Sequence, residues 1–165
     1  MLQEPIPPGT MLRSFLTVSS SLVLTVVSSI VATFGLGLTC FPQFKKYYDA
    51  GDEALQAVMS NNPSDAIPPL MFWSAVLLTA VACLAIGYYI IKTAPFSHFA
   101  HAIFVAVLLF IYYLQTAIAD PPAKKTMTLV YMIVFPMAIL IGAQWTINRM
   151  VRKHESEQAR MLDEG

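Results

Sequence analysis

Charged residues are scarce in this sequence. Asp, Glu, Lys and Arg make up 12% of the 165 residues, which is about half the share in an ordinary soluble domain. A soluble domain of this size buries only about 70% of its unfolded surface, so it needs polar side chains to cover the rest. Ten basic residues balance ten acidic ones, which removes the usual electrostatic basis for binding nucleic acid. The composition excludes a soluble enzyme, a disordered chain and a nucleic-acid-binding protein.

Cysteine and catalytic motifs are equally sparse. The two cysteines, Cys40 and Cys83, do not form a Cys-x-x-Cys pair, so a thiol-oxidase type of membrane enzyme is not supported. The sequence has no Gly-rich phosphate loop, no HExxH and no nucleophile elbow. These absences favour a non-catalytic protein.

The sequence does contain long stretches without charged residues. Four of them, at 14–44, 66–91, 93–119 and 126–148, each exceed the ~20 residues that a helix needs to cross ~30 Å of hydrocarbon. Their apolar residues do not alternate as barrel strands would, so helices satisfy the backbone in lipid. We expect one domain, an all-α integral membrane four-helix bundle. Its spans lie at about 14–39, 70–92, 97–119 and 126–148, with an extramembrane first loop of about 30 residues at 41–69 and a polar tail at 149–165.

The first apolar stretch has to be distinguished from a cleaved signal peptide. It is longer than the 7–15-residue core of a cleaved signal peptide, so we expect it to be retained as a span.

An even number of spans places both termini on one side of the membrane. The two sides then hold six and four basic residues: Arg13, Lys92, Arg149, Arg152, Lys153 and Arg160 against Lys45, Lys46, Lys124 and Lys125. The positive-inside rule therefore favours cytoplasmic or matrix-like termini, in a bacterial inner membrane or an organellar membrane. The first span taken alone indicates the opposite orientation, because one basic residue precedes it and two follow it.

Small and hydroxylated residues recur at four-residue spacing in three of the spans. Such residues let helices approach closely in lipid. The predicted helix-packing residues are Ser21, Thr25, Ser29, Thr33 and Gly37 in the first span, Ala75, Thr79, Cys83 and Gly87 in the second, and Ala138 and Gly142 in the fourth. We interpret these seams as the contacts within this bundle. The alternatives are a seam for another chain or the lining of a pore.

The third span carries the one polar cluster with possible chemistry. At 100° per residue, His98, His101, Tyr112 and Gln115 share an arc of about 100° on one helix face. Polar residues in a membrane helix usually face the bundle interior or a cavity, so this arc is a candidate site for a haem, a metal or a quinone headgroup. The alternative is that both histidines lie among the lipid headgroups with ordinary hydrogen bonds.

The combined pattern predicts a non-catalytic accessory or scaffolding subunit of a larger membrane protein complex. Its expected partners are the lipid bilayer and other membrane protein subunits, and not nucleic acid. One alternative function is a haem- or quinone-site redox component that uses the arc of the third span. The other is an oligomeric pore or small-solute carrier lined by the hydroxyls of the first span.

Overall fold

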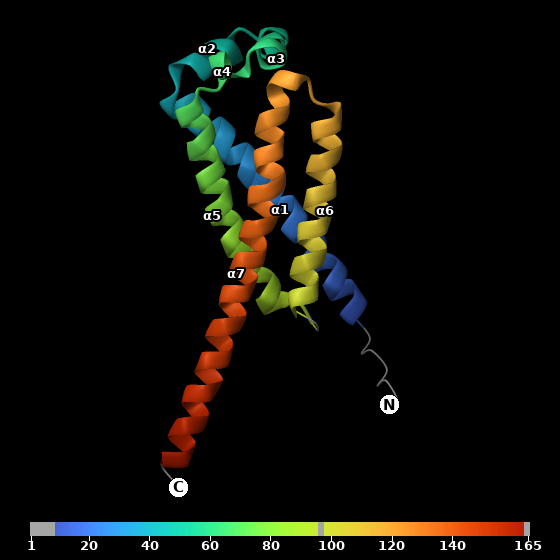
Figure 1. The fold of residues 1–165 in the computed structure, drawn as a ribbon, viewed down its shortest axis with the longest axis vertical. Coiled ribbons are helices and arrows are strands. Elements are labelled where there is room, and N and C mark those ends of the chain that lie inside the picture. Colours follow the sequence, from blue (N-terminus) through green and yellow to red (C-terminus); the bar gives the residue numbers. More distant parts are fainter. Residues whose placement is uncertain (1–8, 96–97, 164–165) are drawn as a thin grey trace.

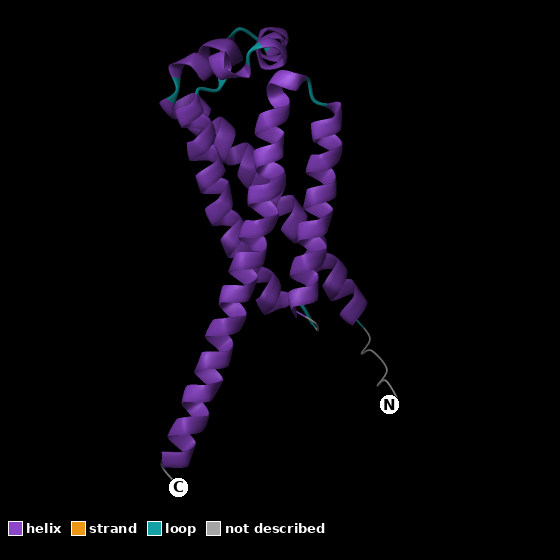
Figure 2. Ribbon diagram, in the orientation of Figure 1, coloured by secondary structure: helices purple, strands orange, loops and turns teal. Residues whose placement is uncertain are grey.

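The chain folds into a bundle of long helices. A computed structural model describes residues 9–95 and 98–163, which contain seven helices and no strand (Figure 2). Four helices are long and apolar enough to cross a membrane: α1 (Thr10–Cys40), α5 (Pro69–Thr93), α6 (His98–Ala119) and α7 (Pro122–Asp163). The predicted all-α membrane four-helix bundle is confirmed. Residue 97 of the predicted third span and residues 164–165 of the predicted tail lie outside the described residues.

The helix ends follow the prolines. Pro69 and Pro122 occupy the first turns of α5 and α7, where the missing N–H would have no partner within the helix in any case. At the other end of α5, Ala94 is extended, as expected for a residue that precedes a proline. Pro136 lies inside α7 without ending it, so this helix gives up one backbone hydrogen bond within the membrane.

The four spans do not contribute equally to the bundle. α7 packs extensively against both α5 and α6, whereas α1 packs mainly against α5. In Figure 1, α1 crosses behind the other three spans at a steep angle. In its most apolar 18-residue stretch 11% of the residues are buried, against 33% to 44% in the other spans. α1 is therefore the least buried of the four spans.

The segment predicted as the extramembrane loop is mostly helical. It forms α2 (Pro42–Asp49), α3 (Asp52–Asn61) and α4 (Pro63–Ala66), which together cap one end of the bundle (Figure 1). Gly51 adopts φ 99° between α2 and α3, a conformation that glycine tolerates best. The side chain of Phe44 is 2% exposed, and its ring lies 5.7 Å from that of Phe34 in α1. The cap is thus held to the bundle by apolar contacts.

At the opposite end, α7 continues beyond the bundle. Its residues from Val151 to Met161 are all exposed, and Figure 1 shows this part projecting away from the other helices. Lys153 and Glu157 form an ion pair of 3.7 Å one turn apart along it. The start of α1 lies at this same end of the bundle. The polar tail predicted from residue 149 is therefore a helical extension of the fourth span as far as Asp163.

Candidate functional site

A column of hydroxyl groups forms the buried face of α1. The side chains of Thr17, Ser21 and Thr25 are at most 3% exposed. The Ser21 hydroxyl donates to the carbonyl of Thr17 at 2.7 Å, and the Thr25 hydroxyl donates to the carbonyl of Ser21 at 2.9 Å. Hydroxyls at four-residue spacing can bond back to their own helix in this way, which makes them tolerable without water.

The same column also contacts polar side chains of the other three spans. Thr25 lies beside the Cys83 thiol of α5, Ser29 lies beside the Tyr113 hydroxyl of α6, and Thr33 lies beside the Tyr131 hydroxyl of α7. We call these six residues the polar seam. It connects α1 to each of the other spans through neutral groups, so it positions helices and offers no acid, base or nucleophile pair for catalysis.

A second set of polar contacts closes the seam at the end where α1 begins. The Arg13 Nε donates to the carbonyl of Thr93 at 2.9 Å, and the hydroxyls of Ser20 and Tyr89 lie 3.3 Å apart. The Thr17 and Thr93 hydroxyls are 3.5 Å apart. Arg13 thus fastens the membrane boundary of α1 to the last turn of α5.

The backbones of α5 and α7 approach each other closely where the two helices cross. A Cβ added at Gly87 would lie 2.3 Å from the carbonyl oxygen of Ile139, and one added at Gly142 would lie 2.2 Å from that of Leu84. A side chain at either position would force the two helices apart, because real Cβ atoms essentially never lie so near a backbone oxygen. The predicted packing residues Ala75, Thr79, Cys83 and Ala138 are also buried.

Gly37, unlike Gly87 and Gly142, lies against side chains and not against a backbone. A Cβ added there would meet side-chain atoms, at 2.4 Å from Phe44 Cδ1 and 2.7 Å from Met71 Cε. The glycine thereby makes room for the aromatic ring that anchors the cap. The remaining packing candidates, Ser29 and Thr33, are partly buried and belong to the polar seam.

The four residues of the predicted cofactor arc differ in burial. His98 and Gln115 are exposed, and Tyr112 is 49% exposed. His101 is buried, at 9% exposed. Within residues 9–95 and 98–163, no group of three or more His, Cys, Asp and Glu side chains is placed to hold a metal ion. Cofactor binding at this arc stays a prediction.

Neither tyrosine of the polar seam is among the predicted site residues. Tyr113, one residue beyond the predicted Tyr112, is 7% exposed. A signal for the buried face of α6 was present, because Ala102 and Ala106 are four residues apart and Ala117 follows Tyr113 at the same spacing. All three alanines are buried. The small-residue rule applied to the other spans would have identified this face.

A small cavity lies between α1, α7 and the cap. Its volume is about 200 Å³, and its polar lining comes from Ser29, Thr33, Lys124, Thr128 and Tyr131. At its edge the Thr128 hydroxyl donates to the carboxylate of Asp120, and Lys124 Nζ lies 3.4 Å from the same carboxylate. A space of this size with several polar neighbours suits a few water molecules.

Comparisons with known proteins identify no relative of this chain. No family model, curated protein or solved structure matches the chain.

Proposed function

We propose that this protein is a non-catalytic accessory or scaffolding subunit of a larger membrane protein complex. The observation that carries the proposal is a groove on α1 that the chain itself leaves open. Its volume is about 390 Å³, and Ser28, Ala32, Gly35 and Leu36 line it from α1 while Leu78 lines it from α5. A Cβ added at Gly35 would meet nothing within 4 Å, so the small size of this residue serves no contact within the described chain.

The spacing of the groove residues favours a helix as its occupant. Ser28, Ala32 and Leu36 follow one another at four-residue intervals, and Gly35 lies seven residues after Ser28. Helices in lipid associate through such small residues, because the two backbones can then come close enough for extensive van der Waals contact. The groove therefore suits a transmembrane helix of a partner subunit.

The projecting part of α7 supports the same function. A helix that is polar on all sides needs a partner or ion pairs along its length to be stable. One ion pair is present here, between Lys153 and Glu157 at 3.7 Å, and His154 Nδ1 lies 3.9 Å from the same carboxylate. The side chains of residues 151–161 are exposed. This extension offers a second contact surface outside the membrane.

The polar seam gives less support to the pore alternative. Its α1 hydroxyls are engaged with Cys83, Tyr113 and Tyr131 of the same chain. A lumen between copies would need those hydroxyls to face outward. The redox alternative would require a bound cofactor, which an absorbance spectrum and metal analysis of the purified protein would detect.

The experiment is purification from the native membrane in mild detergent, followed by mass analysis of the intact particle. We expect a defined set of companion proteins. Gly35→Leu and Ser28→Leu should release them, because leucine fills the groove; a Cβ at Gly35 meets nothing within 4 Å inside the chain. Ala100→Leu is the matched control, since Ala100 is an exposed small residue on α6. A lone monomer from unmodified membranes, or equal release by all three variants, would contradict the proposal.

The basic residues support an orientation for the assembled protein. Lys92 and Arg149 mark the membrane boundary of α5 and α7, and Arg13 contacts the residue after Lys92. We propose that this end faces the cytoplasm or a matrix-like compartment of a bacterial or organellar membrane, in keeping with the positive-inside rule.

A further inference from the structure

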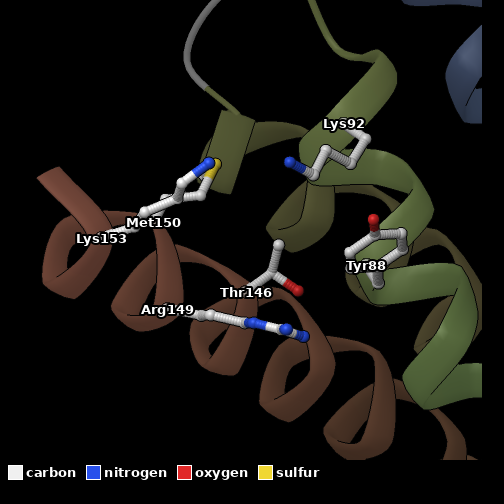
Figure 3. A pocket seen from close by; sticks show the side chains of 6 residues that line it. All are labelled: Tyr88, Lys92, Thr146, Arg149, Met150 and Lys153. Atoms are coloured by element: carbon white, nitrogen blue, oxygen red, sulfur yellow. The ribbon is translucent and has the colours of Figure 1, made fainter.

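A pocket rich in positive charge lies between α5 and α7, at the membrane boundary where α1 begins. Its volume is about 250 Å³. Figure 3 shows Tyr88 and Lys92 reaching it from α5, and Thr146, Arg149, Met150 and Lys153 reaching it from α7. Three of these six side chains are cationic and none is acidic. We call it the cationic pocket.

Aromatic rings hold two of the cations at the edge of this pocket. Lys92 Nζ lies 5.8 Å from the centre of the Tyr88 ring, and the Arg149 guanidinium lies 5.6 Å from that of Trp145. Cation–π contacts of this kind stabilise a charge where water is partly excluded. Lys153 shares its charge with Glu157 at 3.7 Å. Glu157 is itself exposed, so this ion pair is weak and a stronger anion can compete for Lys153.

The position of these charges relative to the lipid is fixed by the sequence. Lys92 ends the uncharged stretch 66–91, and Arg149 ends the uncharged stretch 126–148. Both side chains therefore lie at the level of the lipid headgroups, and Lys153 follows Arg149 by one helical turn. Basic residues between transmembrane helices at this depth are suited to the phosphate of an anionic lipid.

An apolar groove extends from the cationic pocket into the hydrocarbon region. It has a volume of about 510 Å³, and its lining consists of Leu84, Ala85, Tyr88, Ile141, Gly142 and Trp145. Tyr88 lines both spaces. Leu84 and Ile141 each lie eight residues before the cation on their own helix, so the groove reaches about 12 Å deeper. Gly142 forms part of its floor because α5 and α7 touch there.

We propose that the cationic pocket and the apolar groove together bind one anionic phospholipid. The headgroup phosphate lies among Lys92, Arg149 and Lys153, and an acyl chain follows the groove past Ala85 and Gly142. A free phosphate would satisfy the charges but not the groove, and a zwitterionic lipid would satisfy the groove but bring a positive group to the cations. This site is separate from the α1 groove and does not depend on the subunit function.

The test compares lipids that differ only in the headgroup. The full-length protein, delipidated in detergent, is titrated with phosphatidylglycerol and with phosphatidylcholine of the same acyl chains, and bound lipid is counted by native mass spectrometry. We expect phosphatidylglycerol to bind more tightly. Lys92→Gln, Arg149→Gln and Lys153→Gln should each weaken it about fivefold, as expected for one basic residue at a membrane surface.

Two sets of controls separate this site from general charge attraction. Lys45→Gln and Lys46→Gln remove exposed lysines at the capped end, and Arg152→Gln removes an exposed charge of α7 outside the pocket. These variants should bind phosphatidylglycerol as the unmodified protein does. Losses equal to those of the pocket variants would overturn the proposal, as would equal binding of the two lipids.

The groove has its own variant. Ala85 is exposed on the groove wall, so Ala85→Phe should fill the groove and weaken phosphatidylglycerol binding while all three cations remain. Ala100→Phe on α6 is the matched control. If Ala85→Phe binds phosphatidylglycerol normally and inorganic phosphate displaces it, the site binds phosphate alone and the lipid proposal is wrong. Circular dichroism and thermal melting of each variant identify any loss of fold.

Discussion

The contact between α5 and α7 provides the sharpest test of the structure. Substituting Gly142 by alanine would place a Cβ 2.2 Å from the Leu84 carbonyl oxygen and 2.9 Å from the carbonyl carbon and Cα of the same residue. An ordinary contact needs at least 3.4 Å, so the two helices must separate by about 1 Å at this point. The obstacle is backbone on both sides, and no flexible side chain can move aside to relieve it.

The expected magnitude follows from two opposing effects. Adding a methyl group to a packed site costs about 1–3 kcal/mol, whereas alanine favours the helix over glycine by up to about 1 kcal/mol. We expect Gly142→Ala to lower the free energy of unfolding by about 1–2 kcal/mol. Gly87→Ala should behave alike, because its Cβ would lie 2.3 Å from the Ile139 carbonyl oxygen. The double variant should lose less than the sum, since one separation relieves both clashes.

The assay is reversible unfolding in mixed micelles titrated with sodium dodecyl sulfate. It is followed by circular dichroism and by tryptophan fluorescence, to which Trp145 beside the crossing contributes. Gly35→Ala is the control, because a Cβ there meets nothing within 4 Å. It should be neutral or stabilising by up to about 1 kcal/mol. If Gly142→Ala is as stable as Gly35→Ala, the close approach of α5 and α7 is wrong.

Two further predictions concern polar contacts and use the same unfolding assay. Thr25→Val should lower the free energy of unfolding by about 0.6 kcal/mol, the average for a polar side-chain contact between membrane helices. Thr39→Val, at an exposed position on α1, should have little effect, and equal losses would contradict the polar seam. Asp120→Ala should cost about 2 kcal/mol, because the buried Thr128 loses its carboxylate acceptor. Lys124→Ala removes only the ion pair to Asp120 and should lower the free energy of unfolding by less than about 0.5 kcal/mol. A larger decrease for Lys124→Ala than for Asp120→Ala would refute this ranking.

The cap shows where the sequence could be read only in part. Residues 41–69 are polar enough to lie outside the membrane, and the spacing of Leu55, Val58 and Met59 favours a short helix at 52–59, where the structure has α3. The structure makes most of the segment helical, since Pro42 and Pro63 begin helices and Phe44 is buried against α1. The ring of Phe44 packs against Phe34, which belongs to a different helix, so this contact depends on the tertiary structure. The helix α2 is only eight residues long, and a periodic pattern over so short a segment does not predict this packing.

The polar arc of α6 shows a similar limit. Helical geometry puts His98, His101, Tyr112 and Gln115 near one face, but it does not say which face the neighbouring helices cover. α6 turns Ala102, Val105 and Ala106 inward, so His101 lies at the edge of the buried face and Tyr113 enters it. The choice between adjacent tyrosines depends on how α6 is rotated against α1 and α7.

The sequence by itself determined the membrane spans. Each crossing is decided within its own segment, because every charge and every backbone hydrogen bond must be accommodated along that one helix. Only the tertiary structure decided that Gly87 meets Gly142, that hydroxyls of α1 meet Tyr113 and Tyr131, and that Lys92, Arg149 and Lys153 surround one pocket. These pairings join residues far apart in the chain, and lipid outside the bundle is as apolar as the side chains within it. Hydrophobicity therefore cannot select the inner face of a membrane helix, and close packing and polar contacts select it instead.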